Sequence, residues 1–182
     1  MTKKTFAIWL LAAATLAVYL TMIFWTLPYI SSEAGGLWVF DLRSTGYTHT
    51  EAVAFLTALS DAGREMYRTT QFYLDAVFPP LLGLLVIVLA FKLSRHTTLS
   101  LWVYAHVFNL TMIAAVAGCV FDWLENAAVQ DMLVRVPATV TELAVDQASF
   151  WTQLKAGSVT ISFLCLIVLA IARFIKRDRR QA

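Results

Sequence analysis

Four long apolar stretches dominate the pattern of this chain of 182 residues. They cover about 6–28, 70–93, 99–124 and 150–175, and polar segments separate them. Each stretch exceeds the roughly 20 apolar residues that an α-helix needs to cross the ~30 Å hydrocarbon core of a bilayer. The pattern therefore predicts an all-α integral membrane protein, with one membrane domain built as a four-transmembrane-helix bundle.

The segment 31–68, between the first two apolar stretches, combines loop and helix signals. Glycines punctuate its first half, whereas Thr48-His49-Thr50-Glu51 has the form of a capping box at a helix N-terminus. The apolar residues that follow at helical spacing are Ala52, Phe55, Leu56 and Leu59. We predict a short amphipathic helix over about 49–62, ended by Gly63, that lies on the membrane surface or over the bundle.

Charge is scarce and unevenly distributed. The chain is 59% apolar and 14% charged with mean hydropathy +0.69, against roughly a quarter charged residues in soluble domains. Nine of the fourteen Lys and Arg residues, with the single acid Asp178, lie on the side of both termini and the 92–98 connection. The other side carries five basic and eleven acidic residues. Because basic loops stay cytoplasmic, we predict a multi-pass plasma (inner) membrane protein with cytoplasmic termini. Nothing indicates nucleic-acid binding.

Three spans bring an ionisable residue to a similar depth. Counted along each helix from its cytoplasmic end, Asp75 and Lys155 lie about 25–27 Å away and Asp122 about 36 Å away. These positions fall near the outer boundary of a roughly 30 Å core, where a charge needs a partner or a function. We expect a polar cavity open to the outside, in which the candidate catalytic residues are Asp75, Asp122, Glu125 and Lys155.

Other polar residues share the same helix faces. On the second helix, a polar face runs from Arg64 to Asp75 at spacings of three and four residues. In the first outer segment, Asp41, Arg43 and Tyr47 either fold down as a lid or form a locally paired loop. The candidate ligand-binding residues are Arg64, Tyr67, Arg68, Asn126, Trp151, Asp41, Arg43 and Tyr47.

Metal and cofactor chemistry is not favoured. Three carboxylates could hold a divalent cation through oxygen ligands, but the neighbouring Arg and Lys residues argue against it. Cys119 and Cys165 are isolated in apolar stretches and are most simply small packing residues. The sequence therefore predicts no metal and no cofactor.

Two classes of function fit these features. In the first, the protein binds or acts on a small amphipathic molecule, such as a lipid or isoprenoid. Arg64, Arg68 and Lys155 would grip its anionic or polar head, an acidic residue would act as acid or base, and a kink at Pro79-Pro80 would make room for its tail. In the second, the chain is a non-catalytic accessory or assembly subunit, working with a membrane-protein partner or as a homo-oligomer. Its charges are then only a structural staple between helices.

Several short motifs carry a resemblance. They are Asp41-Leu42-Arg43-Ser44-Thr45-Gly46-Tyr47, Gly63-Arg64-Glu65-Met66-Tyr67, Leu74-Asp75 with Phe78-Pro79, Asp122-Trp123-Leu124-Glu125-Asn126, and Lys155. Together they resemble an uncharacterised group of small bacterial four-span inner-membrane proteins, which implies the architecture and no particular activity. In addition, Gly36-Leu37-Trp38 is similar to the Gly-Leu-Trp motif of claudin-type four-span proteins. The paired loop cysteines of that family are absent here.

Overall fold

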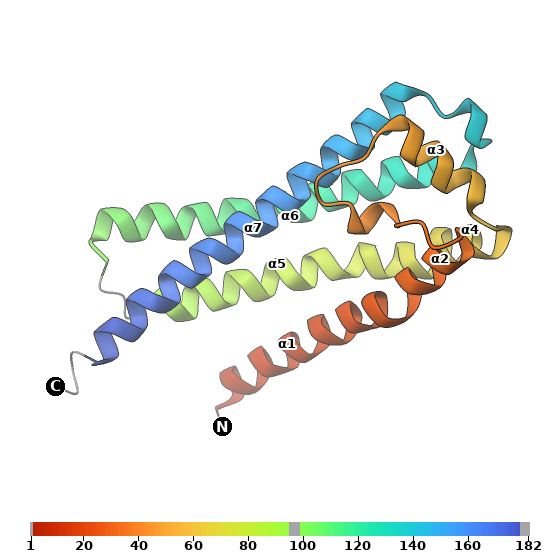
Figure 1. Ribbon diagram of the computed structural model, residues 1–182. Helices are drawn as coiled ribbons and strands as arrows, with labels where there is room; N and C mark the ends of the chain where they lie inside the picture. Colours follow the sequence, from red (N-terminus) through yellow and green to blue (C-terminus); the bar gives the residue numbers. More distant parts are fainter. Residues whose placement is uncertain (1, 95–98, 179–182) are drawn as a thin grey trace.

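Four long helical rods form the protein in a computed structural model that describes residues 2–94 and 99–178 (Figure 1). Each rod is long and apolar enough to cross a membrane, over Lys3–Glu33, Asp61–Ser94, Leu101–Val134 and Glu142–Ile175. The described part of the chain contains no strand, so the predicted all-α four-helix bundle is confirmed. The predicted connection at 95–98 and the basic residues 179–180 lie outside the described residues.

The first two rods are each interrupted by one π-helical segment. The first consists of α1 (Lys3–Thr21), the π-helical Met22–Thr26 and α2 (Leu27–Glu33). The second consists of α4 (Asp61–Met66), the π-helical Tyr67–Gln71 and α5 (Phe72–Ser94). The two π-helical segments pack against each other, and the hydroxyl of Thr26 donates a hydrogen bond to the side-chain oxygen of Gln71. Such π-segments are frequent at functional sites.

The third and fourth rods are longer than the apolar stretches that predicted them. They are α6 (Leu101–Val134) and α7 (Glu142–Asp178), and the 3₁₀ turn Pro137–Thr139 lies between them. The predicted polar segment between these spans is therefore mostly helical. Its acidic residues Asp131 and Asp146 are exposed, while Met132, Leu133 and Val145 are buried, which is the pattern of amphipathic helix ends.

A short helix, α3 (His49–Ala58), packs over the end of the bundle away from the start of α1, which we call the distal end (Figure 1). The predicted capping box is present: the Glu51 N–H donates to the Thr48 hydroxyl at 3.3 Å, and Glu51 Oε2 accepts from the Thr48 N–H at 2.8 Å. The predicted end at Gly63 is wrong. The side chain of Ser60 caps a new helix by accepting from the Gly63 N–H at 3.1 Å, so Gly63 lies inside α4.

Two apolar clusters hold the bundle together. The distal cluster is the larger, and it includes the fully buried Phe40, Phe55 and Met132. The second cluster, centred on Val86 and Leu169, packs α5, α6 and α7 toward the other end.

The paired prolines do not end α5, which continues through Pro79 and Pro80. Since Pro80 has no N–H, the carbonyl of Ala76 loses its usual donor within the helix. The indole N–H of Trp123 on α6 donates to this carbonyl at 3.2 Å. A side chain of the neighbouring helix thus replaces the missing backbone donor.

Candidate functional site

A cavity of about 640 Å³ lies between α1, α5, α6 and α7. Its acidic and basic lining residues gather at the distal end and come from the second, third and fourth rods, together with the segment 41–44. The polar lining residues at the distal end are Asp41, Ser44, Asp75, Asp122, Thr152 and Lys155, whereas the hydroxyl-bearing Thr15, Thr160 and Ser162 line the cavity farther along it. Toward the other end the walls are almost entirely apolar, with lining residues such as Leu16, Leu82, Val86, Ala115 and Val159. The cavity is therefore amphipathic along its length.

The cavity reaches the molecular surface between α1 and α7. Leu16 and Tyr19 on α1 and Phe163 on α7 line it, and their side chains are 54%, 44% and 44% exposed. These residues lie within the spans, so this opening faces lipid when the helices cross a bilayer. A molecule with an apolar tail can thus enter from the side of the bundle.

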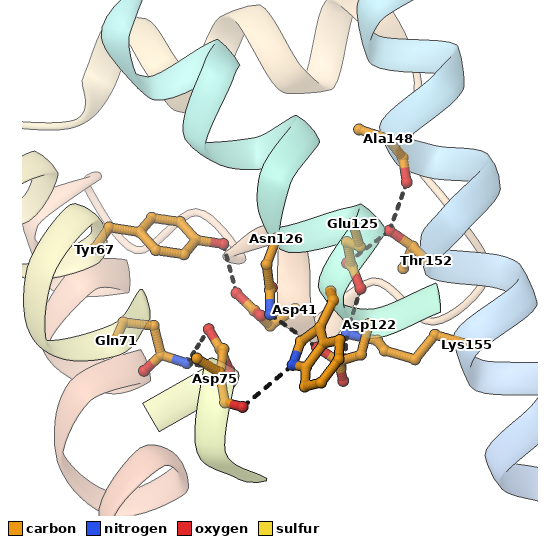
Figure 2. A network of polar contacts seen from close by, with 12 residues as sticks. Asp41, Tyr67, Gln71, Asp75, Asp122, Glu125, Asn126, Ala148, Thr152 and Lys155 are labelled. Carbon is orange, nitrogen blue, oxygen red and sulfur yellow. Dashed lines mark hydrogen bonds and ion pairs between the residues drawn. The ribbon is translucent and has the colours of Figure 1, made fainter. Parts of the chain in front are cut away.

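Lys155 is the centre of one polar network at the distal end. Its ammonium contacts Glu125 Oε2 and lies 3.7 Å from Asp122 Oδ2 (Figure 2). The other oxygen of Glu125 accepts a hydrogen bond from Thr152 at 2.7 Å, and Asp122 accepts one from Asn126 at 3.0 Å. Buried ions need such additional hydrogen bonds, because their desolvation is costly. The network therefore fixes α6 against α7.

A second polar network consists of neutral donors and two carboxyl groups. The Gln71 amide, held by Thr26, donates to both oxygens of Asp75 at 2.9 Å. The hydroxyl of Tyr67 donates to Asp41 at 2.5 Å (Figure 2). Within residues 2–94 and 99–178, neither Asp75 nor Asp41 has a basic nitrogen within 4.0 Å. These two carboxyl groups thus face the cavity with no ion-pair partner.

The π-helical segment explains why these donors line up. Eight residues of regular α-helix turn about 80° beyond two full turns, so Tyr67 and Asp75 would face different directions. A π-helix is wider and turns less per residue, which compensates for this excess. Tyr67, Gln71 and Asp75, spaced by four residues, consequently all point to the same side of the helix, into the polar network that includes Asp41 (Figure 2).

The segment 40–47 lies over the cavity as a lid. Phe40 anchors it through ring contacts of 4.7 Å with Tyr47 and 4.9 Å with Phe55, and the Tyr47 N–H donates to Ser149 at 2.9 Å. Burial first, and the charge of Glu125 second, raise the pKa of the Tyr47 hydroxyl, which therefore stays protonated. The sequence left open whether this segment is a lid or a locally paired loop. Asp41 lines the cavity, as expected for a lid.

Arg43, in contrast, is paired locally, as expected for the second alternative of a locally paired loop. Its guanidinium donates to the Trp38 carbonyl at 2.8 and 3.0 Å and lies 3.6 Å from Glu51. It therefore holds the lid in place from outside the cavity.

Arg64 and Arg68, which the sequence predicted to bind the head of a ligand, do not line the cavity. Arg64 donates to the carbonyls of Leu133 and Leu56, near the C-terminal ends of α6 and α3. Helix C-termini leave such carbonyls unpaired, so they compete effectively for a guanidinium. Arg68 is exposed, and neither arginine lines the cavity.

The remaining predicted residues contact residues of the site without lining the cavity themselves, or lie away from the site. Tyr67 and Asn126 orient Asp41 and Asp122, whereas Glu125 contacts Lys155 from behind the cavity wall. Trp151 stacks on Phe121 at 5.8 Å and does not line the cavity.

Three neutral residues of the site were missing from the predicted set. Gln71, Thr26 and Thr152 are fully buried, and each hydrogen-bonds a carboxyl group or its donor. A sequence signal existed, because Gln71 lies four residues before Asp75 and Thr152 three before Lys155, spacings that share a helix face.

The cavity thus offers a carboxyl-rich head region that can accept hydrogen bonds, bind charge and exchange protons. In the described part of the chain, no group of three His, Cys, Asp or Glu residues is arranged to hold a metal ion. Comparisons with known protein families, with curated proteins and with solved structures give no match to this chain.

Proposed function

We propose that this chain binds a small amphipathic molecule, of lipid or isoprenoid type, in the cavity between its four spans. The polar head would lie among Asp41, Asp75, Asp122 and Lys155, and the tail along the apolar walls toward α1 and α7. The amphipathic cavity is the observation that supports this proposal. Its volume of about 640 Å³ falls in the range of roughly 300–1,000 Å³ usual for small-molecule sites.

The distribution of basic residues supports an orientation with the distal end outside a bacterial inner membrane and both termini in the cytoplasm. The ligand would then enter from the outer leaflet, through the opening between α1 and α7. If the protein also carries out chemistry, Asp75 and Asp122 are the candidate acid and base, because both line the cavity. Glu125 would position Lys155 without touching the ligand.

Filling the cavity tests the proposal. Ala156 lines the cavity on α7, whereas Ala170 is exposed on the same helix, so Ala156→Phe and Ala170→Phe form a matched pair. Native mass spectrometry of protein purified in mild detergent should show a bound amphiphile in the unmodified chain and in Ala170→Phe. The signal should be lost in Ala156→Phe.

A second filling variant, Ala12→Phe, acts from the opposite wall and guards against a local packing defect at 156. Thermal unfolding of all variants shows whether each one folds. Equal retention of an amphiphile in the filled and control variants would contradict the proposal, as would its absence from folded, unmodified protein.

The accessory-subunit alternative is favoured by one observation. Lys155 pairs directly with Glu125 and Asp122, which joins α6 to α7 whether or not a ligand is present. In that case the same mass measurement finds no amphiphile, and variants of the head region change stability alone.

A further inference from the structure

Carboxyl groups outnumber cations at the polar end of the cavity. Asp41, Asp75 and Asp122 line it, and Glu125 lies directly behind Lys155. Against these four carboxyl groups the same region holds one ammonium, that of Lys155. The site as folded is therefore rich in negative charge or in bound protons.

The other basic residues of the distal half do not neutralise the carboxyl groups of the cavity. In the described chain, Arg43 and Arg64 are engaged with backbone carbonyls, Arg135 pairs with Asp131 at 2.7 Å, and Arg68 is exposed. None of them lines the cavity. Any further positive charge has to come from what the cavity binds.

Of these four carboxyl groups, Asp41 and Asp75 have no ion-pair partner among the described residues. Lys155 is already shared by Glu125 and Asp122, whereas Asp41 and Asp75 receive hydrogen bonds from the neutral Tyr67 and Gln71. Asp75 is only 5% exposed. A buried carboxylate without a counter-ion is costly, so a cation or a proton has to compensate it.

An aromatic pair adds a second feature that suits a cation. Phe78 lies one turn along α5 from Asp75 and stacks on Tyr19 at 5.8 Å, and both rings line the cavity. Aromatic rings attract ammonium groups through the negative potential of their faces.

We propose that the head of the bound molecule is an organic cation, an amine or quaternary ammonium, held between Asp41 and Asp75. This inference rests on the proposed function and narrows its ligand to a cationic amphiphile. It replaces the anionic head expected from Arg64 and Arg68, which the structure places away from the cavity. The largely apolar walls beyond the head favour an organic cation over a bare metal ion, because they suit a hydrocarbon tail, which a metal ion lacks.

Three probes with the same dodecyl tail separate head charge from tail binding. They are dodecyltrimethylammonium, dodecyl maltoside and dodecyl phosphate, titrated into full-length protein in lipid nanodiscs and counted by native mass spectrometry. The Ala156→Phe variant supplies the background for binding outside the cavity. The cationic probe should bind at least about tenfold more tightly than the anionic one.

Asp75→Asn and Asp41→Asn should each weaken binding of the cationic probe about tenfold and leave the neutral probe unchanged. Asp146→Asn is the control, because Asp146 is an exposed carboxylate on α7 away from the cavity. The two variants lie on different elements, so a folding defect in one does not remove the test.

The outcomes separate the inference from the function on which it rests. If the neutral or anionic probe binds as tightly as the cationic one and Ala156→Phe abolishes this binding, the cavity binds amphiphiles but the cationic head is refuted. If Asp75→Asn and Asp41→Asn behave like Asp146→Asn, the cationic head is likewise refuted. If Ala156→Phe changes the binding of no probe, both the inference and the proposed function fail.

Discussion

Replacing Lys155 by Met tests whether burial, rather than distance, sets the strength of ion pairs in this bundle. The side chains of Lys155 and Glu125 are 15% and 1% exposed, whereas those of Arg135 and Asp131 are 44% and 49% exposed. Both pairs are in close contact. Arg135→Met is therefore a control that also breaks a close ion pair, but an exposed one at the end of a single helix.

The expected magnitudes differ because of what each substitution leaves behind. Lys155→Met leaves the Glu125 carboxylate buried with only the hydrogen bond from Thr152, and breaking a buried pair costs about 3–5 kcal/mol. That is about a hundredfold or more in the unfolding equilibrium. Arg135→Met exposes Asp131 to water and should cost about 0–1 kcal/mol.

A double variant isolates the charge from the loss of packing. In Lys155→Met with Glu125→Gln, the amide oxygen of residue 125 can still accept from Thr152 and carries no charge. We expect this second change to recover about 1–3 kcal/mol of the loss. Unfolding in mixed micelles with increasing sodium dodecyl sulfate, followed by the fluorescence of the six tryptophans, measures the unmodified chain, Lys155→Met, Glu125→Gln, their double variant and Arg135→Met. If Lys155→Met costs no more than Arg135→Met, or if the two losses simply add, the reasoning is wrong.

Three further substitutions test the packing around the site by the same unfolding assay. Gly63→Ala should destabilise the protein strongly, because a Cβ at this position would lie 2.5 Å from Glu33 Cβ; a loss below about 1 kcal/mol would contradict this contact. Trp123→Phe should cost about 1 kcal/mol of unfolding free energy in the unmodified chain, because the Ala76 carbonyl loses its donor. In a Pro80→Ala background the N–H of residue 80 can donate to this carbonyl, so the same substitution should cost almost nothing. Equal costs in both backgrounds would refute the idea that Trp123 replaces the missing donor. Hydrogen bonds from Thr48, the larger effect from its N–H and the smaller from its hydroxyl, lower the pKa of the Glu51 carboxyl group. The unmodified protein should therefore be more stable than Glu51→Ala at neutral pH. This advantage should decrease as the pH falls below about 4.3, and a constant advantage would argue against the capping role.

The convergence of charges was predictable because it follows from helix geometry alone. Counting 1.5 Å per residue placed Asp75 and Lys155 at one depth, and the structure brings both to one cavity together with Asp122. The number of spans followed equally directly from the length of the apolar stretches. These predictions required no knowledge of how the helices pack.

The partners of the charges were not predictable in the same way. Helix-face arguments put Arg64 on the same face as Asp75, but they could not show that the ends of α3 and α6 present carbonyls within reach of its guanidinium. Those arguments also assumed regular α-helix, whereas the π-helical Tyr67–Gln71 changes which residues share a face. Spacing along α7 puts Thr152 on the same face as Lys155, but it could not show that the Thr152 hydroxyl bonds Glu125 of another helix.

The opening between α1 and α7 has a consequence for selectivity. In the proposed function, a molecule that enters there would exchange with the surrounding leaflet and not with water, because exposed lining residues of both helices lie within the spans. Lipid chains are about as apolar as the cavity walls, so transferring a hydrocarbon tail between them changes the free energy little. Discrimination would consequently depend on the headgroup, and the fraction of occupied protein would follow the mole fraction of the amphiphile in the bilayer instead of its aqueous concentration.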